Sequence, residues 1–328
     1  MAMRRKDILR VLRQGKPISG ETLAKEMGVS RTSVWKYINK LRLEGYQIRS
    51  SPRIGYSLAD DLDVLLPEDI DAGLKSKWRI DFRREVGSTQ EVARELAVGG
   101  ASEDTVVVAE RQNKGRGRLG RSWVSPLGGV YLSFILRPQL KLLEILRLPL
   151  LAGVAVADAI REVSGLQPSL KWPNDVLLGG LKVGGILCEL DGEADSVNHI
   201  ILGIGVNVNN KTPRTLKGIA TSLKEECGGS LSRGKFIGCL LDETESLYLR
   251  SKDEGFEPIL AAWKRLSSTL GSEVIVGGTL GEEIEGKAVD IDRNGALLIR
   301  KSDGEVVRVV AGDVSLRKDG RKEDQWKS

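Results

Sequence analysis

The chain has 328 residues, 41% of them hydrophobic, which is enough for two or three domains with separate cores. Its formal net charge of +5 is mildly basic, so any contact with nucleic acid has to come from a local patch. Three scattered cysteines and one histidine argue against a Cys/His zinc site and a histidine-based catalytic triad. No apolar run reaches the roughly 18 residues that span a bilayer, so we expect a cytoplasmic protein with no membrane contact.

The first sixty residues predict a winged helix-turn-helix that binds DNA. Apolar spacing indicates a helix over residues 4–13, a second helix that Ser19 caps and Gly28 ends, and a third that begins after Ser30. Residues 46–58 look like the two strands of a wing. A packing module with a merely solvated basic face is the alternative. The candidate DNA contacts are the outward hydrogen-bond donors of the third helix, Arg31, Thr32, Ser33, Lys36, Asn39 and Lys40, with Arg49 and Arg53 of the wing.

An acidic segment at residues 59–66 separates this unit from a region where strands alternate with amphipathic helices, as in a mixed α/β layer. Residues 105–112 and 128–138 are expected to be adjacent strands, and residues 146–163 a long buried helix. Residues 169–190 read as a strand, a turn and two further strands. The last apolar run, residues 200–209, is expected to close the sheet.

The segment KGRGRLGR, residues 114–121, predicts an anion site between the two adjacent strands. Glycine permits positive φ and exposes backbone amides, while the planar fork of arginine fits phosphate or carboxylate. The pattern is neither GxxxxGK[ST] nor GxGxxG, so it does not support the nucleotide folds that use those loops. A loop that becomes ordered around a phosphate ligand fits best; a disordered arginine-glycine tract that binds RNA is the alternative.

Five motifs occur in one order: EVGSTQ (85–90), AERQNKGRGRLGRSWVSP (109–126), KWPND (171–175), LKVGGIL (181–187) and GIGVNVN (203–209). Together they resemble the bifunctional biotin protein ligases that also repress the biotin operon, over nearly the whole chain. The resemblance implies an α+β multidomain fold. Its parts are a winged helix-turn-helix at 1–62, a class II synthetase-like mixed α/β ligase domain at 63–268, an SH3-like β-barrel at 269–317, and a disordered tail at 318–328.

Strand-like alternation around Asn294-Gly295 and Asp303-Gly304 hairpin turns agrees with the small barrel. Within the family the barrel assists engagement of ATP and of the acceptor protein. The alternative is a merely stabilising appendage, and the sequence does not choose between them.

The same resemblance implies that the chain makes biotinyl-5′-adenylate from biotin and ATP and passes biotin to a lysine of a biotin carboxyl carrier protein. Because a carboxylate meets an α-phosphate, cations have to offset their repulsion. The family pattern assigns catalysis to Lys182, Arg116, Arg118 and Asp175. It assigns biotin to Ser88, Thr89, Gln90, Gln112, Arg116, Gly117, Arg118, Lys182 and Gly185, and ATP to Arg118, Arg121, Trp123, Lys171, Asn174 and Asn207.

Some of these roles stay open. Asn174 and Asp175 offer oxygen ligands for Mg²⁺, but Asp175 could instead orient the incoming lysine of the carrier. Ser88 and Thr89 could simply cap a helix, and Trp172 is expected in the core.

As a repressor of this family, the chain would bind operator DNA of biotin genes, with the adenylate as corepressor of a homodimer formed through the central sheets. The alternatives are a ligand-sensing repressor without turnover and a lipoate or octanoate ligase. The first is disfavoured because the catalytic pattern is intact, and the second because GRGRxGR belongs to the biotin branch.

Overall fold

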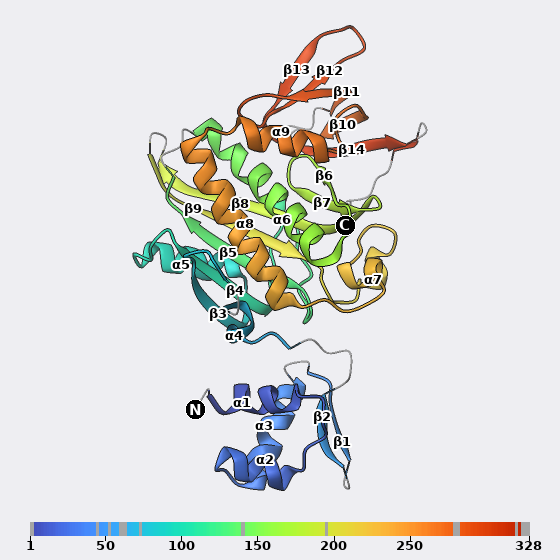
Figure 1. Ribbon diagram of the computed structural model, residues 1–328. Coiled ribbons are helices and arrows are strands. Elements are labelled where there is room, and N and C mark those ends of the chain that lie inside the picture. Colours follow the sequence, from blue (N-terminus) through green and yellow to red (C-terminus); the bar gives the residue numbers. More distant parts are fainter. Residues whose placement is uncertain are drawn as a thin grey trace. The chain divides into compact units, whose positions relative to one another are not determined.

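The computed structural model describes residues 3–43, 46–51, 54–58, 64–71, 74–138, 142–193, 196–277, 283–318 and 321–322. The chain forms two compact units, residues 1–71 and residues 72–328. Figure 1 shows the helical first unit and the large sheet of the second. Within the described ranges, no helix is long and apolar enough to cross a membrane.

The first unit is a winged helix-turn-helix, as predicted. Ser19 Oγ accepts a hydrogen bond from the Thr22 amide at 3.0 Å, and Gly28 ends the second helix with a φ of +60°. Buried Ile8, Leu23 and Ile38 join the three helices in one core. The elements are α1 (Met3–Leu12), α2 (Gly20–Met27), α3 (Arg31–Leu43), β1 (Ile48–Ser51) and β2 (Gly55–Leu58). Arg53, a predicted wing contact, lies outside the described residues.

A fourth short helix, α4 (Pro67–Asp71), belongs to the same unit. Asp69 caps its start by accepting from the Leu66 amide at 2.9 Å, and it pairs with Arg13 at 2.6 Å. The end of α1 and α4 are thereby tied together. The division of the chain thus follows α4, whereas the sequence predicts a domain boundary at 62/63.

The core of the second unit is a seven-stranded mixed sheet in the order β3-β4-β5-β9-β8-β7-β6. Among these strands β3 and β4 are parallel and the other neighbours antiparallel. The strands are β3 (Arg79–Val86), β4 (Thr105–Gln112), β5 (Val130–Leu136), β6 (Ser169–Lys171), β7 (Asp175–Leu178), β8 (Leu181–Glu193) and β9 (Ser196–Val206). The expectation that the last apolar run closes the sheet is wrong: β9 lies in the middle, where both of its faces are covered.

Helices cover both faces of this sheet. On one face, Ala93 and Ala97 of α5 pack against Val107, Ile135 and Ile201. On the other face, α6 contacts β6 to β9 and packs against α8 and α9 (Figure 1). The helices are α5 (Thr89–Val98), α6 (Arg147–Ser164), α7 (Leu223–Cys227), α8 (Arg233–Asp253) and α9 (Glu257–Leu266), with 3₁₀ turns at Arg118–Gly120, Leu142–Leu146 and Arg214–Leu216.

The C-terminal strands form an all-antiparallel sheet in the order β13-β12-β11-β10-β14-β15. The two predicted hairpin turns are confirmed, since Gly295 and Gly304 have φ of +90° and +88° between paired strands. The strands are β10 (Glu273–Gly277), β11 (Glu283–Ile291), β12 (Leu297–Arg300), β13 (Val306–Val309), β14 (Asp313–Lys318) and β15 (Arg321–Lys322). The sequence predicts disorder over 318–328, but β15 pairs with β14; residues 319–320 and 323–328 lie outside the described part.

Trp172 joins the C-terminal sheet to the central one. Its indole Nε1 donates to the Gly295 carbonyl oxygen at 2.9 Å, and its backbone amide donates to Thr269 Oγ1 at 2.9 Å. The side chain is buried, which confirms its predicted place in the core.

Candidate active site

A cavity of about 260 Å³ is lined by residues of the α5 end, the segment after β4, the KWPND motif, β8, β9 and β14. Three glycines form the floor of the cavity, where a larger residue would not fit. A Cβ at Gly205 would lie 2.5 Å from Trp123 Nε1, and one at Gly203 would lie 2.9 Å from Gln90 Cδ. Gly185 is the cross-strand partner of Gly205. The motif glycines thus make room for neighbouring side chains and a ligand.

Residues 112–125 form a hairpin over this cavity, here called the cationic hairpin. Its arms are joined by hydrogen bonds from the Gln112 amide to the Ser125 carbonyl oxygen at 3.1 Å and from the Gly117 amide to the Arg121 carbonyl oxygen at 2.8 Å. At the tip, Leu119 has a φ of +54°. The hairpin presents Arg116, Arg118 and Arg121 to the cavity.

The C-terminal sheet holds the tip of the cationic hairpin. Arg121 Nη2 lies 2.5 Å from Asp313 Oδ2, and Arg118 Nη2 donates to the Gly312 carbonyl oxygen at 3.2 Å. Arg118 Nη1 also donates to Asn174 Oδ1 at 3.1 Å. Burial lowers the pKa of the Arg118 guanidinium, and the charge of Asp313 opposes that shift. The sequence did not single out Gly312 or Asp313, because they lie in an ordinary strand pattern without a motif.

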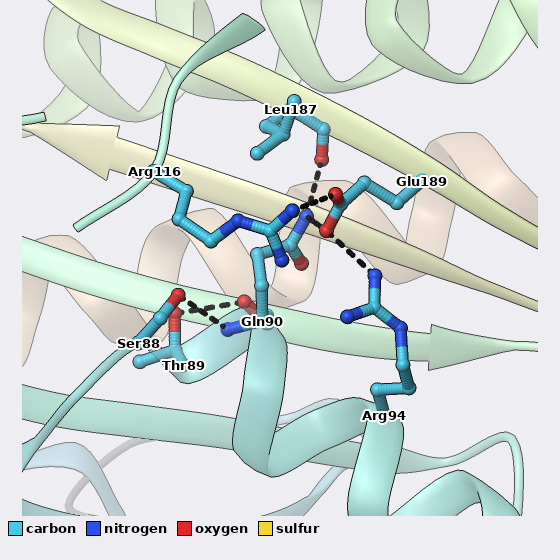
Figure 2. A network of polar contacts seen from close by, with 8 residues as sticks. Ser88, Thr89, Gln90, Arg94, Arg116, Leu187 and Glu189 are labelled. Carbon is cyan, nitrogen blue, oxygen red and sulfur yellow. Dashed lines mark hydrogen bonds and ion pairs between the residues drawn. The ribbon is translucent and has the colours of Figure 1, made fainter. Parts of the chain in front are cut away.

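One arm of the cationic hairpin is held by Glu189 of β8 (Figure 2). Arg116 Nη2 donates to Glu189 Oε1 at 2.8 Å, while Arg94 Nη2 and Gln90 Nε2 reach Oε2 at 3.0 and 3.2 Å. Glu189 and Arg94 were not predicted; no short motif relates them to Arg116.

The α5 end of the cavity carries neutral polar groups in a connected network. Gln112 Oε1 accepts from the Thr89 amide at 2.8 Å and from Thr89 Oγ1 at 3.1 Å, and Ser133 Oγ donates to Thr89 Oγ1 at 2.8 Å. Ser88 caps α5 by accepting from the Gln90 amide at 3.2 Å, so the capping role weighed for it is confirmed. Gln90 Oε1 is buried without a hydrogen-bond partner among the described residues, which favours a ligand that donates to it.

A cation and a carboxylate meet at the centre. Lys182 Nζ lies 2.6 Å from Asp175 Oδ1, and both side chains are 15% exposed. The same ammonium lies 5.4 Å from the centre of the Trp123 ring, a cation–π distance. Lys171 lines the cavity beside them. The arrangement can hold an anionic ligand between several positive groups.

The predicted biotin, ATP and catalytic residues all line this one cavity. Two of them, Asn207 and Asn174, also have partners within the protein. Asn207 Nδ2 donates to the Thr221 carbonyl oxygen and its Oδ1 accepts from Asn210, each at 3.0 Å, so its amide fixes the chain after β9. Asn174 Oδ1 is occupied by Arg118.

The candidate magnesium ligands face cations. Asn174 Oδ1 accepts from Arg118 and Asp175 Oδ1 pairs with Lys182. Across the described ranges, no group of three or more His, Cys, Asp or Glu residues could hold a metal. This donor set does not fit a magnesium ion bound by the protein alone.

The outward face of α3 in the first unit is a second candidate site. Arg31, Thr32, Lys36 and Lys40 are exposed, beside Trp35, whose side chain is 55% exposed. Ser33 Oγ lies 2.9 Å from Ser30 Oγ, and Asn39 Oδ1 accepts from Arg42 at 3.2 Å, so these two are partly engaged.

Comparisons with known proteins agree with both sites. Residues 83–207 match the Biotin/lipoate A/B protein ligase family, residues 4–57 an HTH domain, and residues 269–317 the biotin protein ligase C terminal domain. The bifunctional ligase/repressor BirA of Bacillus subtilis is 39% identical over 95% of this chain and 98% of its own length. The protein of the same name from Escherichia coli is 30% identical, over 94% and 96%.

Among solved structures, the biotin protein ligase from Aquifex aeolicus in complex with biotin and ATP matches with a TM-score of 0.65 and 36% identity, covering 74% of this chain and 100% of that one. The full-length relatives, the three family matches and the cavity described above lead to one assignment. The chain belongs to the family of bifunctional ligase/repressor BirA proteins.

Proposed function

We propose that the chain joins biotin to ATP as biotinyl-5′-adenylate, transfers biotin to a lysine of a carrier protein, and represses transcription when the adenylate is bound. The observation that carries the ligase activity is the convergence of Lys182, Arg116, Arg118 and Arg121 on one cavity whose other end is neutral and polar. A cytoplasmic location, where ATP is available, is part of the proposal.

The ureido ring of biotin would occupy the polar end of the cavity. Its two N–H groups and its carbonyl oxygen need partners there, because a buried polar group without one costs about 1–3 kcal/mol. Gln90 Oε1 is a buried acceptor with no partner in the described structure, and Ser88 and Thr89 add hydroxyls beside it. The apolar body of biotin would lie over the floor that Gly203 and Gly205 leave open.

Adenylate formation requires the biotin carboxylate to attack the α-phosphorus of ATP while pyrophosphate leaves. Lys182 would stabilise the charge shared between carboxylate and α-phosphate, and Arg116 and Arg118 would do so from the cationic hairpin. Arg121 and Lys171 would meet the other phosphates. Mg²⁺ would arrive with ATP and offset phosphate charge, because Asn174 and Asp175 face cations and the described residues include no cluster of metal-binding side chains.

Transfer requires the lysine amine of the carrier to attack the acyl carbon of the mixed anhydride while AMP leaves. Asp175 would receive and orient this lysine, since its carboxylate lines the cavity and already pairs with the ammonium of Lys182 at 2.6 Å. Trp123 would cover the activated group and exclude water, because its ring packs over Gly205 and Gly185. No serine or cysteine nucleophile is needed for either step.

Labelled biotin, ATP and a biotin carboxyl carrier domain test the ligase activity. We expect label on the carrier lysine and release of pyrophosphate. Labelling by lipoate or octanoate instead of biotin would contradict the proposal.

Gel-shift assays against the promoters of the organism's own biotin genes, with and without biotin plus ATP, test the proposed repressor activity. In such a complex α3 would lie in the major groove of the DNA.

We expect biotin and ATP together to shift the chain from monomer to dimer in sedimentation velocity. The adenylate would neutralise the cationic hairpin and allow two central sheets to join at an outer strand. The two winged units of the dimer would then bind half-sites separated by whole turns of the DNA helix, about 34–36 Å each. Either ligand alone is the control, since it cannot form the adenylate. An unchanged sedimentation coefficient with both ligands would refute this dimerisation.

We expect Gly205→Ala to weaken biotin binding by more than tenfold without unfolding the chain. The added methyl group would lie 2.5 Å from Trp123 Nε1 and would push the indole into the cavity. Isothermal titration measures the effect. Gly229→Ala is the matched control, because a Cβ there meets nothing within 4 Å; equal affinity of both variants would contradict the role given to Gly205.

A further inference from the structure

Glu189 lies on the same face of β8 as Gly185 and Leu187, because alternate residues of a strand share a face. Gly185 and Leu187 line the cavity, and Glu189 follows just beyond it. Its side chain is 20% exposed, so the charge is only partly hydrated. The proposed reaction gives this carboxylate no role, although it contacts two elements that form the cavity.

The two carboxylate oxygens of Glu189 serve different elements (Figure 2). Oε1 accepts from Arg116 of the cationic hairpin at 2.8 Å. Oε2 accepts from Arg94 and Gln90 of α5 at 3.0 and 3.2 Å. Glu189 therefore connects the hairpin to the helix whose first turn forms the polar end of the cavity.

The contacts of Glu189 with Arg94 and Arg116 are also ion pairs. Two guanidinium groups, those of Arg94 and Arg116, face one carboxylate. Without that carboxylate the two cations would face each other, and Arg116 would lose the contact that holds it to β8. Gly117, which the family pattern assigns to biotin, is the next residue in the chain, so a displacement of Arg116 also displaces Gly117.

We propose that Glu189 is a positioning residue that holds Arg116, and with it the near arm of the cationic hairpin, closed over the bound adenylate. The proposal rests on the proposed function, because it concerns retention of the adenylate. Glu189 itself touches neither substrate; it acts through Arg116.

The test is the dissociation rate of radiolabelled biotinyl-5′-adenylate from the full-length chain, followed as protein-bound label after addition of excess unlabelled biotinyl-5′-adenylate. We expect Glu189→Gln to raise this rate about tenfold, because the neutral amide leaves Arg116 and Arg94 unscreened. Arg116→Gln should raise the rate by at least as much. Arg94→Met is the matched control on the helix side and should stay within twofold of the unmodified chain.

The double variant Glu189→Gln with Arg116→Gln separates positioning from a general structural effect. If Glu189 acts through Arg116, the double variant dissociates no faster than Arg116→Gln alone. The proposal would be overturned if the double variant showed the product of the two single increases in dissociation rate. It would also be overturned if the rate for Glu189→Gln stayed within twofold of the unmodified chain. If the unmodified chain forms no adenylate at all, the proposed function itself fails, and that outcome is distinct.

Discussion

Replacing Lys182 with methionine is expected to slow formation of biotinyl-adenylate by about 100- to 1,000-fold, the usual loss when one preorganised charge donor is removed from a transition state. Methionine has a similar length and keeps the contact with Trp123, but it carries no charge. The ammonium of Lys182 lies 2.6 Å from Asp175 and is 15% exposed, so water cannot easily replace it. Biotin-dependent pyrophosphate exchange measures the step.

Lys235→Met on α8 is the control for this substitution. Lys235 is exposed on the helix that begins with Arg233, away from the residues that line the cavity, so its variant should exchange pyrophosphate at the normal rate. A rate for Lys182→Met within a factor of ten of the unmodified chain would remove Lys182 from the mechanism.

Arg233→Met is expected to lower the free energy of unfolding by about 3–5 kcal/mol, which is the cost of removing one partner from a buried ion pair. Arg233 is 0% exposed and Glu110 1% exposed, and Arg233 Nη2 lies 2.8 Å from Glu110 Oε1. Arg233 Nη1 also donates to the Gly129 carbonyl oxygen at 3.1 Å. The pair ties the start of α8 to β4 and to the segment before β5. Urea unfolding of the full chain, followed by fluorescence, measures the loss.

The double variant Glu110→Met with Arg233→Met is the informative control. Replacing both charges with apolar side chains of similar size removes the uncompensated carboxylate, so most of the lost stability should return. If Arg233→Met alone lowers the free energy of unfolding by less than about 1 kcal/mol, Arg233 and Glu110 do not form a buried ion pair.

Local signals predicted much of the fold. Helix ends and tight turns depend on hydrogen bonds and φ angles within a few consecutive residues, so the sequence indicates them directly. Examples are the helix ends at Ser19 and Gly28 and the turns at Asn294 and Gly304. The central position of β9 was not predictable in this way, because an apolar run does not reveal which strands lie beside it.

The site likewise combines residues that motifs predict with residues that only the fold brings together. Motifs supplied the residues that line the cavity, from the resemblance and the chemistry of the arginine-glycine segment. They did not supply Glu189, Ser133 or Asp313, which meet the site through strand register and domain packing. For Asn207, sequence gave the right location, but the contacts to Thr221 and Asn210 required the fold.

The contact of Asp313 and Gly312 with the arginines of the cationic hairpin has a consequence during protein synthesis. The other walls of the cavity leave the ribosome well before β14 does. A nascent chain therefore lacks the counter-ion for Arg121 until β14 has been synthesised. Truncated products that end before this strand would carry every ligase motif and keep the contacts of Arg116 with Glu189 and of Arg118 with Asn174, but the tip of the hairpin would lack Asp313 and Gly312.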